Sequence, residues 1–241
     1  MAQTASVPNY LSSLALNRAK WRIENPPNNK YYEHHVGSWT ATLLKNVFTN
    51  DPWLLTSEKA DEHSFKKPDF VIEKALSNEE SHMHLICEIK KYGGDRMEKA
   101  LDQAVNHIAE TIDDLGNNNN NKFEVFILVQ RGLDIGFFEY HNDISNLDEE
   151  GIGHFRGCVS LTQNQPTGHA VIDENTPDLK PLFFDSGKLR TEKLTNEDEQ
   201  NIRDEAMEYN IPCIFNINHH HNEINHLIHH ILTNEPRSSV P

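Results

Sequence analysis

Three charged residues in the first half of the chain have types and a spacing suited to metal-dependent chemistry: Asp69, Glu88 and Lys90. Glu88 and Lys90 are two apart on a predicted strand, so their side chains point to the same side of it. Both stand at the end of that strand, just before the turn at residues 92–94, and Asp69 begins the preceding predicted strand. If the two strands pair as a hairpin, the register can bring Asp69 level with Glu88. The sequence therefore predicts two carboxylates and one ammonium group within a few ångströms of each other.

Two carboxylates at the edge of a sheet can hold a hard divalent cation such as Mg²⁺ and leave positions for water and a phosphate oxygen. A neighbouring lysine can orient or deprotonate the attacking water, or offset the charge that builds on phosphorus. The alternative is that Asp69 only caps a turn and that Glu88 and Lys90 form a solvated strand edge. The strand is otherwise apolar at residues 85–87 and at Ile89, which favours burial, and buried charges need partners.

Residues 67–70 (Lys-Pro-Asp-Phe), followed further along the chain by residues 87–90 (Cys-Glu-Ile-Lys), resemble the signature of the PD-(D/E)XK, or restriction-endonuclease-like, nuclease superfamily. Pro-Asp opens one predicted strand, Glu-x-Lys closes the next, and a long helix follows at once. The resemblance covers residues 32–140. It implies a restriction-endonuclease-like core and hydrolysis of phosphodiester bonds.

The resemblance also implies a site for Mg²⁺ or Mn²⁺. The implied metal ligands are Asp69, Glu88, Glu33 and the backbone carbonyl of Ile89, and the implied catalytic residues are Asp69, Glu88, Lys90 and Glu33. Glu33 is included among the implied ligands because in this superfamily the helix before the first core strand often supplies an acidic residue to the metal. Glu58 is the alternative to Glu33, and Lys90 would position the water.

The helix after the Glu-x-Lys strand supplies candidate substrate-binding residues. In the branch that resembles RecB-type and phage-exonuclease-type nucleases, this helix carries Gln-x-x-x-Tyr, whereas here Gln103 is followed four residues later by His107. Arg96, Lys99 and Gln103 lie with His107 on one stripe at helical spacing, so they could contact substrate phosphates together. The alternative is an ordinary solvated helix face.

Hydrophobic periodicity predicts the elements that carry these residues. Helices are predicted at residues 32–48, 96–115, 196–209 and 221–232, and strands at residues 68–74, 84–90, 123–129, 135–140, 155–161, 181–185 and 211–217. This order favours the α/β class, with a mixed central sheet flanked by helices. We expect a lead-in segment at residues 1–30 with a loose or peripheral helix, a nuclease-like core at residues 31–140, and a C-terminal extension of the same domain at residues 141–241.

Composition limits where and how such a protein can work. The 241 residues carry 22 Lys and Arg against 37 Asp and Glu, a formal charge of −15, so a nucleic acid must be bound by a local basic patch or through a metal. The three widely spaced cysteines fit neither a disulfide framework nor a zinc ribbon. Without an apolar span or a secretory signal, we expect an intracellular protein of the cytoplasm or nucleus that is not bound to a membrane.

These observations predict a metal-dependent nuclease acting on nucleic acid, with DNA favoured over RNA. Many members of the superfamily act as dimers, so a homodimer is also a candidate assembly. The alternative is an inactive nuclease-like module that binds protein or nucleic acid, because a fold does not guarantee an activity. A third interpretation is a structural protein in which the acidic pair only forms salt bridges.

Histidines are frequent in the last predicted helix. His226 and His230 are four residues apart, so on a helix they could share a metal ion. The stretch contains no His-Glu-x-x-His motif. We therefore interpret it as a polar helix face enriched in histidine.

Overall fold

The computed structural model describes residues 7–57, 68–78, 80–94, 97–114, 122–143, 159–162, 168–172, 179–181, 184–185, 188–189 and 212–235. The helices are α1 (Leu14–Glu24), the short 3-10 helix η1 (Pro27–Asn29), α2 (Glu33–Val47), α3 (Met97–Asp114) and α5 (His221–Thr233). The strands are β1 (Trp53–Ser57), β2 (Phe70–Ala75), β3 (Ser81–Lys90), β4 (Lys122–Arg131), β5 (Asp134–Asp143), β6 (Val159–Thr162), β7 (Gly168–Ile172), β8 (Leu179–Pro181), β9 (Phe184–Asp185), β10 (Lys188–Leu189) and β11 (Pro212–Asn216).

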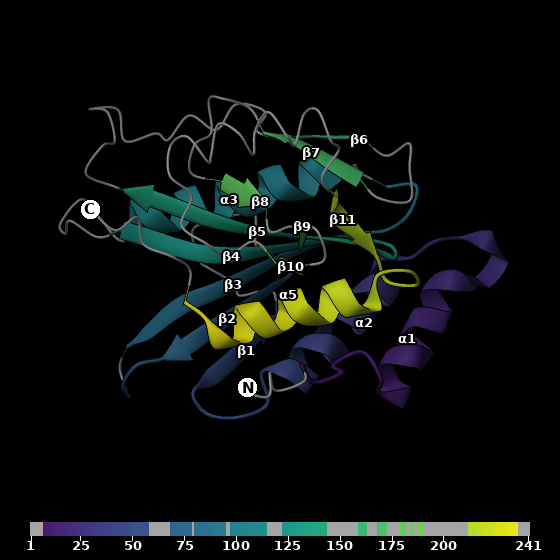
Figure 1. The fold of residues 1–241 in the computed structure, drawn as a ribbon, viewed down its shortest axis with the longest axis horizontal. Coiled ribbons are helices and arrows are strands. Elements are labelled where there is room, and N and C mark those ends of the chain that lie inside the picture. The colour runs from purple at the N-terminus through teal and green to yellow at the C-terminus, as the bar shows by residue number, and fades with distance from the viewer. Residues whose placement is uncertain are drawn as a thin grey trace.

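One nine-stranded mixed sheet organises these elements, in the order β1-β2-β3-β4-β5-β11-β7-β6, with β8 pairing to β5 (Figure 1). β3 and β4 run parallel, whereas the other neighbours described in this sheet are antiparallel. Parallel neighbours cannot be joined by a tight turn, so the chain crosses between them through α3. The protein is therefore mixed α/β with helices flanking a mixed sheet, as the sequence predicts.

The sheet is buried on both faces where β3 and β4 lie. Cys87 and Ile89 pack into a core formed with α1, α2 and α5, whereas Ile86 and Val129 pack into a second core formed with α3 (Figure 1). Because successive side chains of a strand alternate between faces, both strands need apolar residues at nearly every position. Glu88 has the same parity as Ile86, so its side chain points toward α3.

Helix α2 lies unusually close to β3. A Cβ atom on Gly37 would stand 3.0 Å from Cδ1 of Ile89, so the absence of a side chain at position 37 allows this approach. Val36 and Leu43, on the same face of α2, are buried in the core. The contact with Ile89 holds the first turn of α2, which begins with Glu33, over the carboxyl end of β3.

Some elements differ from the sequence-based predictions. The periodicity did not predict β1, whose side chains do not alternate regularly between buried and exposed. The strand predicted at 181–185 is two short strands, β8 and β9, while β7 and β10 were not predicted. The helix predicted at 196–209 lies outside the described residues. The amino-terminal helix expected as loose or peripheral is α1, which is not loose, because it buries Leu16, Ala19 and Ile23 against the core.

The helices can also be compared with the thickness of a bilayer. Within the described ranges, none combines the length and the apolar composition that crossing a membrane requires.

Candidate active site

Asp69 and Glu88 lie at the same end of the β2–β3 hairpin. The last pair of this ladder joins Phe70 to Cys87, so one step further places Asp69 level with Glu88. Directly opposed residues of an antiparallel pair share one face of the sheet. The backbone N–H of Ile89 donates a hydrogen bond of 2.7 Å to Oδ2 of Asp69. This bond fixes the Asp69 carboxyl at the end of β3.

Glu88 is a buried carboxylate beside an ammonium group and an imidazole. Its exposed fraction is 3%, Nζ of Lys90 lies 3.6 Å from its Oε2, and Nε2 of His107 lies 3.2 Å from its Oε1. The contact with His107 lacks hydrogen-bond alignment, and among the described residues none donates a hydrogen bond to Oε1. Leaving a buried carboxylate oxygen without a donor costs free energy. Oε1 of Glu88 therefore keeps an acceptor capacity that the hydrogen bonds of the described residues do not use.

The electrostatic environment of Asp69 shows that the predicted acidic residues lie close together. Burial raises the pKa of Asp69 from 3.8 to about 7, the hydrogen bond from Ile89 opposes this rise, and the charges of Glu88 and, more weakly, Glu33 add to it. Lys90 lowers the same pKa. Glu33, Glu88 and Lys90 therefore all lie within electrostatic reach of Asp69.

The backbone of β3 adds a carbonyl group to the same edge. The Lys90 carbonyl accepts a hydrogen bond from the N–H of Gly132, so it points toward β4. In a strand, the carbonyl one residue earlier points the opposite way, and the N–H of Ile89 already points toward Asp69. The Ile89 carbonyl therefore faces the β2 side, beyond Phe70, where the ladder with β2 ends.

The remaining predicted site residues have different positions. Lys99 is exposed on α3, and Gln103 is half-buried on the same helix. Oε1 of Gln103 is buried and receives no hydrogen bond from the described part of the chain. Arg96, and Glu58 as the alternative to Glu33, lie outside the described residues.

The sequence places His107 on the helix stripe that could contact substrate phosphates, whereas the structure places it beside the Glu88 carboxylate. Its position four residues after Gln103, where the resemblance expects tyrosine, was the signal in the sequence. His107 is itself buried, so the contact with Glu88 is made inside the α3 side of the core.

The donor set is small. The described ranges contain no group of three or more His, Cys, Asp or Glu side chains arranged to hold a metal ion. Mg²⁺ does not require such a cage, because it is often bound by one or two carboxylates and keeps several waters or substrate phosphates. Asp69, Glu88 and the Ile89 carbonyl offer a donor set of that kind.

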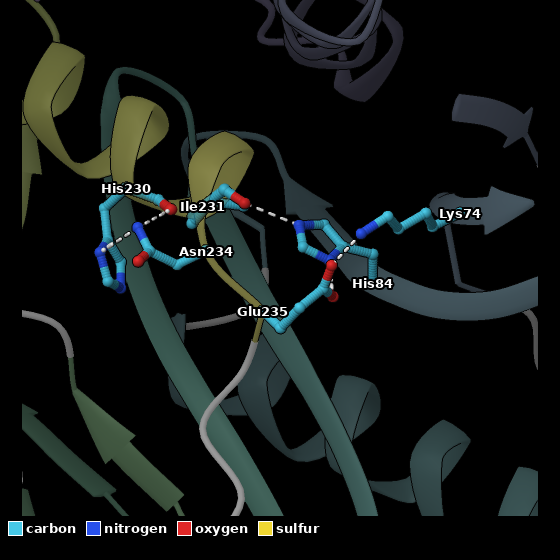
Figure 2. Close-up of polar contacts among 6 residues, drawn as sticks. All are labelled: Lys74, His84, His230, Ile231, Asn234 and Glu235. Atoms are coloured by element: carbon cyan, nitrogen blue, oxygen red, sulfur yellow. Dashed lines mark hydrogen bonds and ion pairs between the residues drawn. The ribbon is translucent and has the colours of Figure 1, made fainter. Parts of the chain in front are cut away.

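A second polar cluster ties α5 to β3 (Figure 2). His84 is fully buried, and its Nε2 lies 2.7 Å from the carbonyl oxygen of Ile231. A carbonyl only accepts hydrogen bonds, so Nε2 carries the proton. Figure 2 shows Glu235 between Lys74 and His84: it forms an ion pair with Lys74, and its Oε2 lies 3.5 Å from Nδ1 of His84, a contact that becomes an ion pair when His84 is protonated. Nothing in the sequence singled out His84, because its partners come from the far end of the chain.

The histidines of α5 do not form one polar face. His226 is exposed, whereas His230 is buried and packs edge-on against Phe126 at 5.7 Å between ring centroids. Nδ2 of Asn234 lies 3.1 Å from Nδ1 of His230 (Figure 2). Assigning His230 to a polar face was therefore wrong, because α5 turns this residue into the core.

We expect His84→Gln to make folding less sensitive to acid. Burial lowers the pKa of His84 below 6.5, as do His82 and Lys74, while the hydrogen bond to Ile231 and the charge of Glu235 oppose this. As the pH falls below 6.5, His84 binds a proton in the unfolded chain before it does so in the folded protein. Wild-type stability is therefore lost in this pH range. Urea unfolding measures this effect. The free energy of unfolding of wild type should exceed that of His84→Gln at pH 7, and the difference should shrink as the pH falls to 5. A constant difference would contradict the lowered pKa.

Asp69, Glu88 and Lys90 thus gather at the carboxyl end of β3. No model of a known protein family and no curated protein matches the sequence. What this site does is therefore inferred from the chemistry of its own residues.

Proposed function

We propose that this protein is a divalent-metal-dependent nuclease with a restriction-endonuclease-like core, which hydrolyses phosphodiester bonds of nucleic acid, DNA in preference to RNA. The observation that carries the proposal is the Glu88 carboxylate, which is 3% exposed, has one unsatisfied oxygen and lies beside Asp69 and Lys90. The parallel β3–β4 pair joined through α3 agrees with the resemblance of residues 67–70 and 87–90 to PD-(D/E)XK nucleases.

The residues of the site fit Mg²⁺ or Mn²⁺. Asp69, Glu88 and the Ile89 carbonyl would hold the ion, and Glu33 would add negative charge from α2. The raised pKa of Asp69 supports this fit, because mutual repulsion among the acidic groups contributes to it and a cation would relieve that repulsion. When bound, such an ion polarises a phosphoryl oxygen and lowers the pKa of a coordinated water.

Lys90 is the residue of this chain best placed to act on the reacting groups. Its ammonium group carries three donors, and the ion pair with Glu88 keeps it at the end of β3. From there it can orient the attacking water or donate to a phosphate oxygen as negative charge develops. Gln103 and Lys99, on α3, would contact substrate phosphates further from the scissile bond.

Metal binding tests the proposal directly. We expect Mn²⁺ or Mg²⁺ to bind wild-type protein in calorimetric titrations and to raise its melting temperature. Glu88→Gln should abolish both effects, because a neutral amide replaces the buried charged ligand. Glu80→Gln is the matched control, since Glu80 is exposed in the turn at the other end of β3. Equal binding by wild type and Glu88→Gln would exclude the proposed site.

An inactive nuclease-like module is the second candidate. It is favoured by the absence, within the described residues, of a group of three or more metal-binding side chains, and by His107 at the position where the resemblance expects tyrosine. Such a module would bind nucleic acid or protein without binding Mn²⁺ and without cleavage. The titrations above, combined with a binding assay on an oligonucleotide, separate the two functions.

A further inference from the structure

Three aromatic side chains stand next to residues of the candidate active site in the chain. Tyr31 and Tyr32, with exposed fractions of 43% and 36%, immediately precede Glu33, and the half-buried Tyr92 follows Lys90 by two residues. Large aromatic groups are usually buried at least in part, because they lose favourable free energy in water. We call Tyr31, Tyr32 and Tyr92 the aromatic platform.

Tyr92 is held in place by its neighbours. The rings of Tyr31 and Tyr92 meet edge to face, with 5.4 Å between centroids and 78° between planes. The hydroxyl of Tyr92 accepts a hydrogen bond of 3.0 Å from the N–H of Leu133. Gly132 has a φ of +60°, and a Cβ at this position would stand 2.3 Å from the Tyr92 ring. A surface that is fixed before binding loses little conformational entropy when a ligand stacks on it.

A shallow depression lies beside the platform. Tyr31, Tyr32 and Tyr92 line it together with His35 and Lys91. Nδ1 of His35 is buried and receives no hydrogen bond from the described part of the chain. The depression therefore combines aromatic faces, one cation and one unsatisfied polar atom.

Three cations, Lys91, Arg131 and Arg22, lie around the platform, and the Asp134 carboxylate is also within electrostatic reach of Tyr92. Lys91 is exposed, and the guanidinium carbon of Arg131 lies 5.9 Å from the centroid of the Tyr92 ring. The pKa of His35 is lowered first by burial and then by the charges of His34 and Arg22, which places Arg22 within electrostatic reach of the depression. A local basic surface of this kind is what an acidic protein needs in order to bind a polyanion.

We propose that the aromatic platform binds an unpaired segment of single-stranded nucleic acid, whose bases stack on Tyr31 and Tyr32 and whose phosphates contact Lys91 and Arg131. Stacking on aromatic side chains beside a basic groove is the usual physical basis of single-strand binding, and it does not require a particular base. A duplex hides its base faces, so it would make only the phosphate contacts. This inference deepens the proposed nuclease function and rests on it, since the platform adjoins Glu33 and would deliver a single strand to the site.

Fluorescence anisotropy with a short, labelled oligothymidylate tests the platform without catalysis, in buffer containing EDTA. The variant Tyr31→Ala/Tyr32→Ala should bind about 5- to 150-fold more weakly for each base that loses its stacking partner. Tyr31→Phe/Tyr32→Phe should bind within a few-fold of wild type, because the rings remain. Both tyrosines are exposed, so thermal unfolding should be nearly unchanged in either variant. Leu76→Ala is the control, because Leu76 is an exposed apolar residue just beyond the far end of β2, about 20 Å along the strand from Phe70.

Each outcome decides the inference. It is overturned if wild type does not bind the oligothymidylate, if the alanine variant binds as tightly as wild type, or if a duplex of the same length binds as tightly as the single strand. Cleavage that depends on Lys90 but not on the tyrosines would overturn the platform and leave the nuclease proposal standing. Tyrosine-dependent binding without cleavage in Mg²⁺ or Mn²⁺ would support the platform and exclude the nuclease.

Discussion

Replacing Lys90 with methionine is expected to lower the rate of phosphodiester cleavage by about 10²- to 10⁴-fold. Methionine keeps most of the apolar stem of lysine and removes the ammonium group, which lies 3.6 Å from Glu88 in the wild type. The loss should appear in the turnover rate, because the ammonium acts on groups whose charge changes during the reaction. Initial rates on single-stranded DNA, duplex DNA and RNA, each with Mg²⁺ and with Mn²⁺, measure the effect and identify the substrate.

The control for this experiment is Lys45→Ala. Lys45 is exposed in the last turn of α2, about 18 Å along the helix from Glu33, so its removal changes the net charge equally without touching the site. Melting curves recorded with Mn²⁺ show whether Lys90→Met remains folded. Full activity in Lys90→Met would exclude the proposed role of Lys90. Activity that also survives in Glu88→Gln would come from a contaminating nuclease.

Elements with strong periodicity could be predicted from the sequence. The apolar positions of α3 recur at helical spacing, and β3 and β4 are short apolar runs because both of their faces are buried. β1 gave no such signal, because it is short and Leu54, its second residue, is 51% exposed. Its place at the edge of the sheet depends on pairing with β2, which local periodicity does not encode.

The candidate site was predictable where it depends on local geometry. The two-residue period of β3 places Glu88 and Lys90 on one face, and the hairpin places Asp69 opposite Glu88. The contact of His107 with Glu88 depends instead on how α3 crosses the sheet. The burial of His84 against Ile231 likewise depends on how α5 docks. Spacing along the chain specifies neither of these packing arrangements.

In buffer without divalent cations, Asp69→Asn is expected to become more stable than wild type as the pH rises. Because the pKa of Asp69 is raised from 3.8 to about 7, its folded carboxyl holds a proton that the unfolded chain has already released. The stability from this group is complete below pH 3.8 and is lost as the pH rises through 7. Asparagine keeps an acceptor for the N–H of Ile89 and carries no charge to bury, so it should not show this loss.

The free energy of unfolding of Asp69→Asn should therefore gain on that of wild type by about 2 kcal/mol between pH 5 and pH 8, after allowance for solvent screening. Urea unfolding in EDTA at the two pH values measures this gain. Asp51→Asn controls for the loss of one negative charge, because Asp51 lies in an exposed turn. Adding Mn²⁺ at pH 8 should then stabilise wild type more than Asp69→Asn, since only the carboxylate gives the ion a charged ligand. If the difference between the two proteins did not change with pH, Asp69 would titrate as an ordinary surface carboxylate and the case for a cation-binding cluster would lose its electrostatic basis.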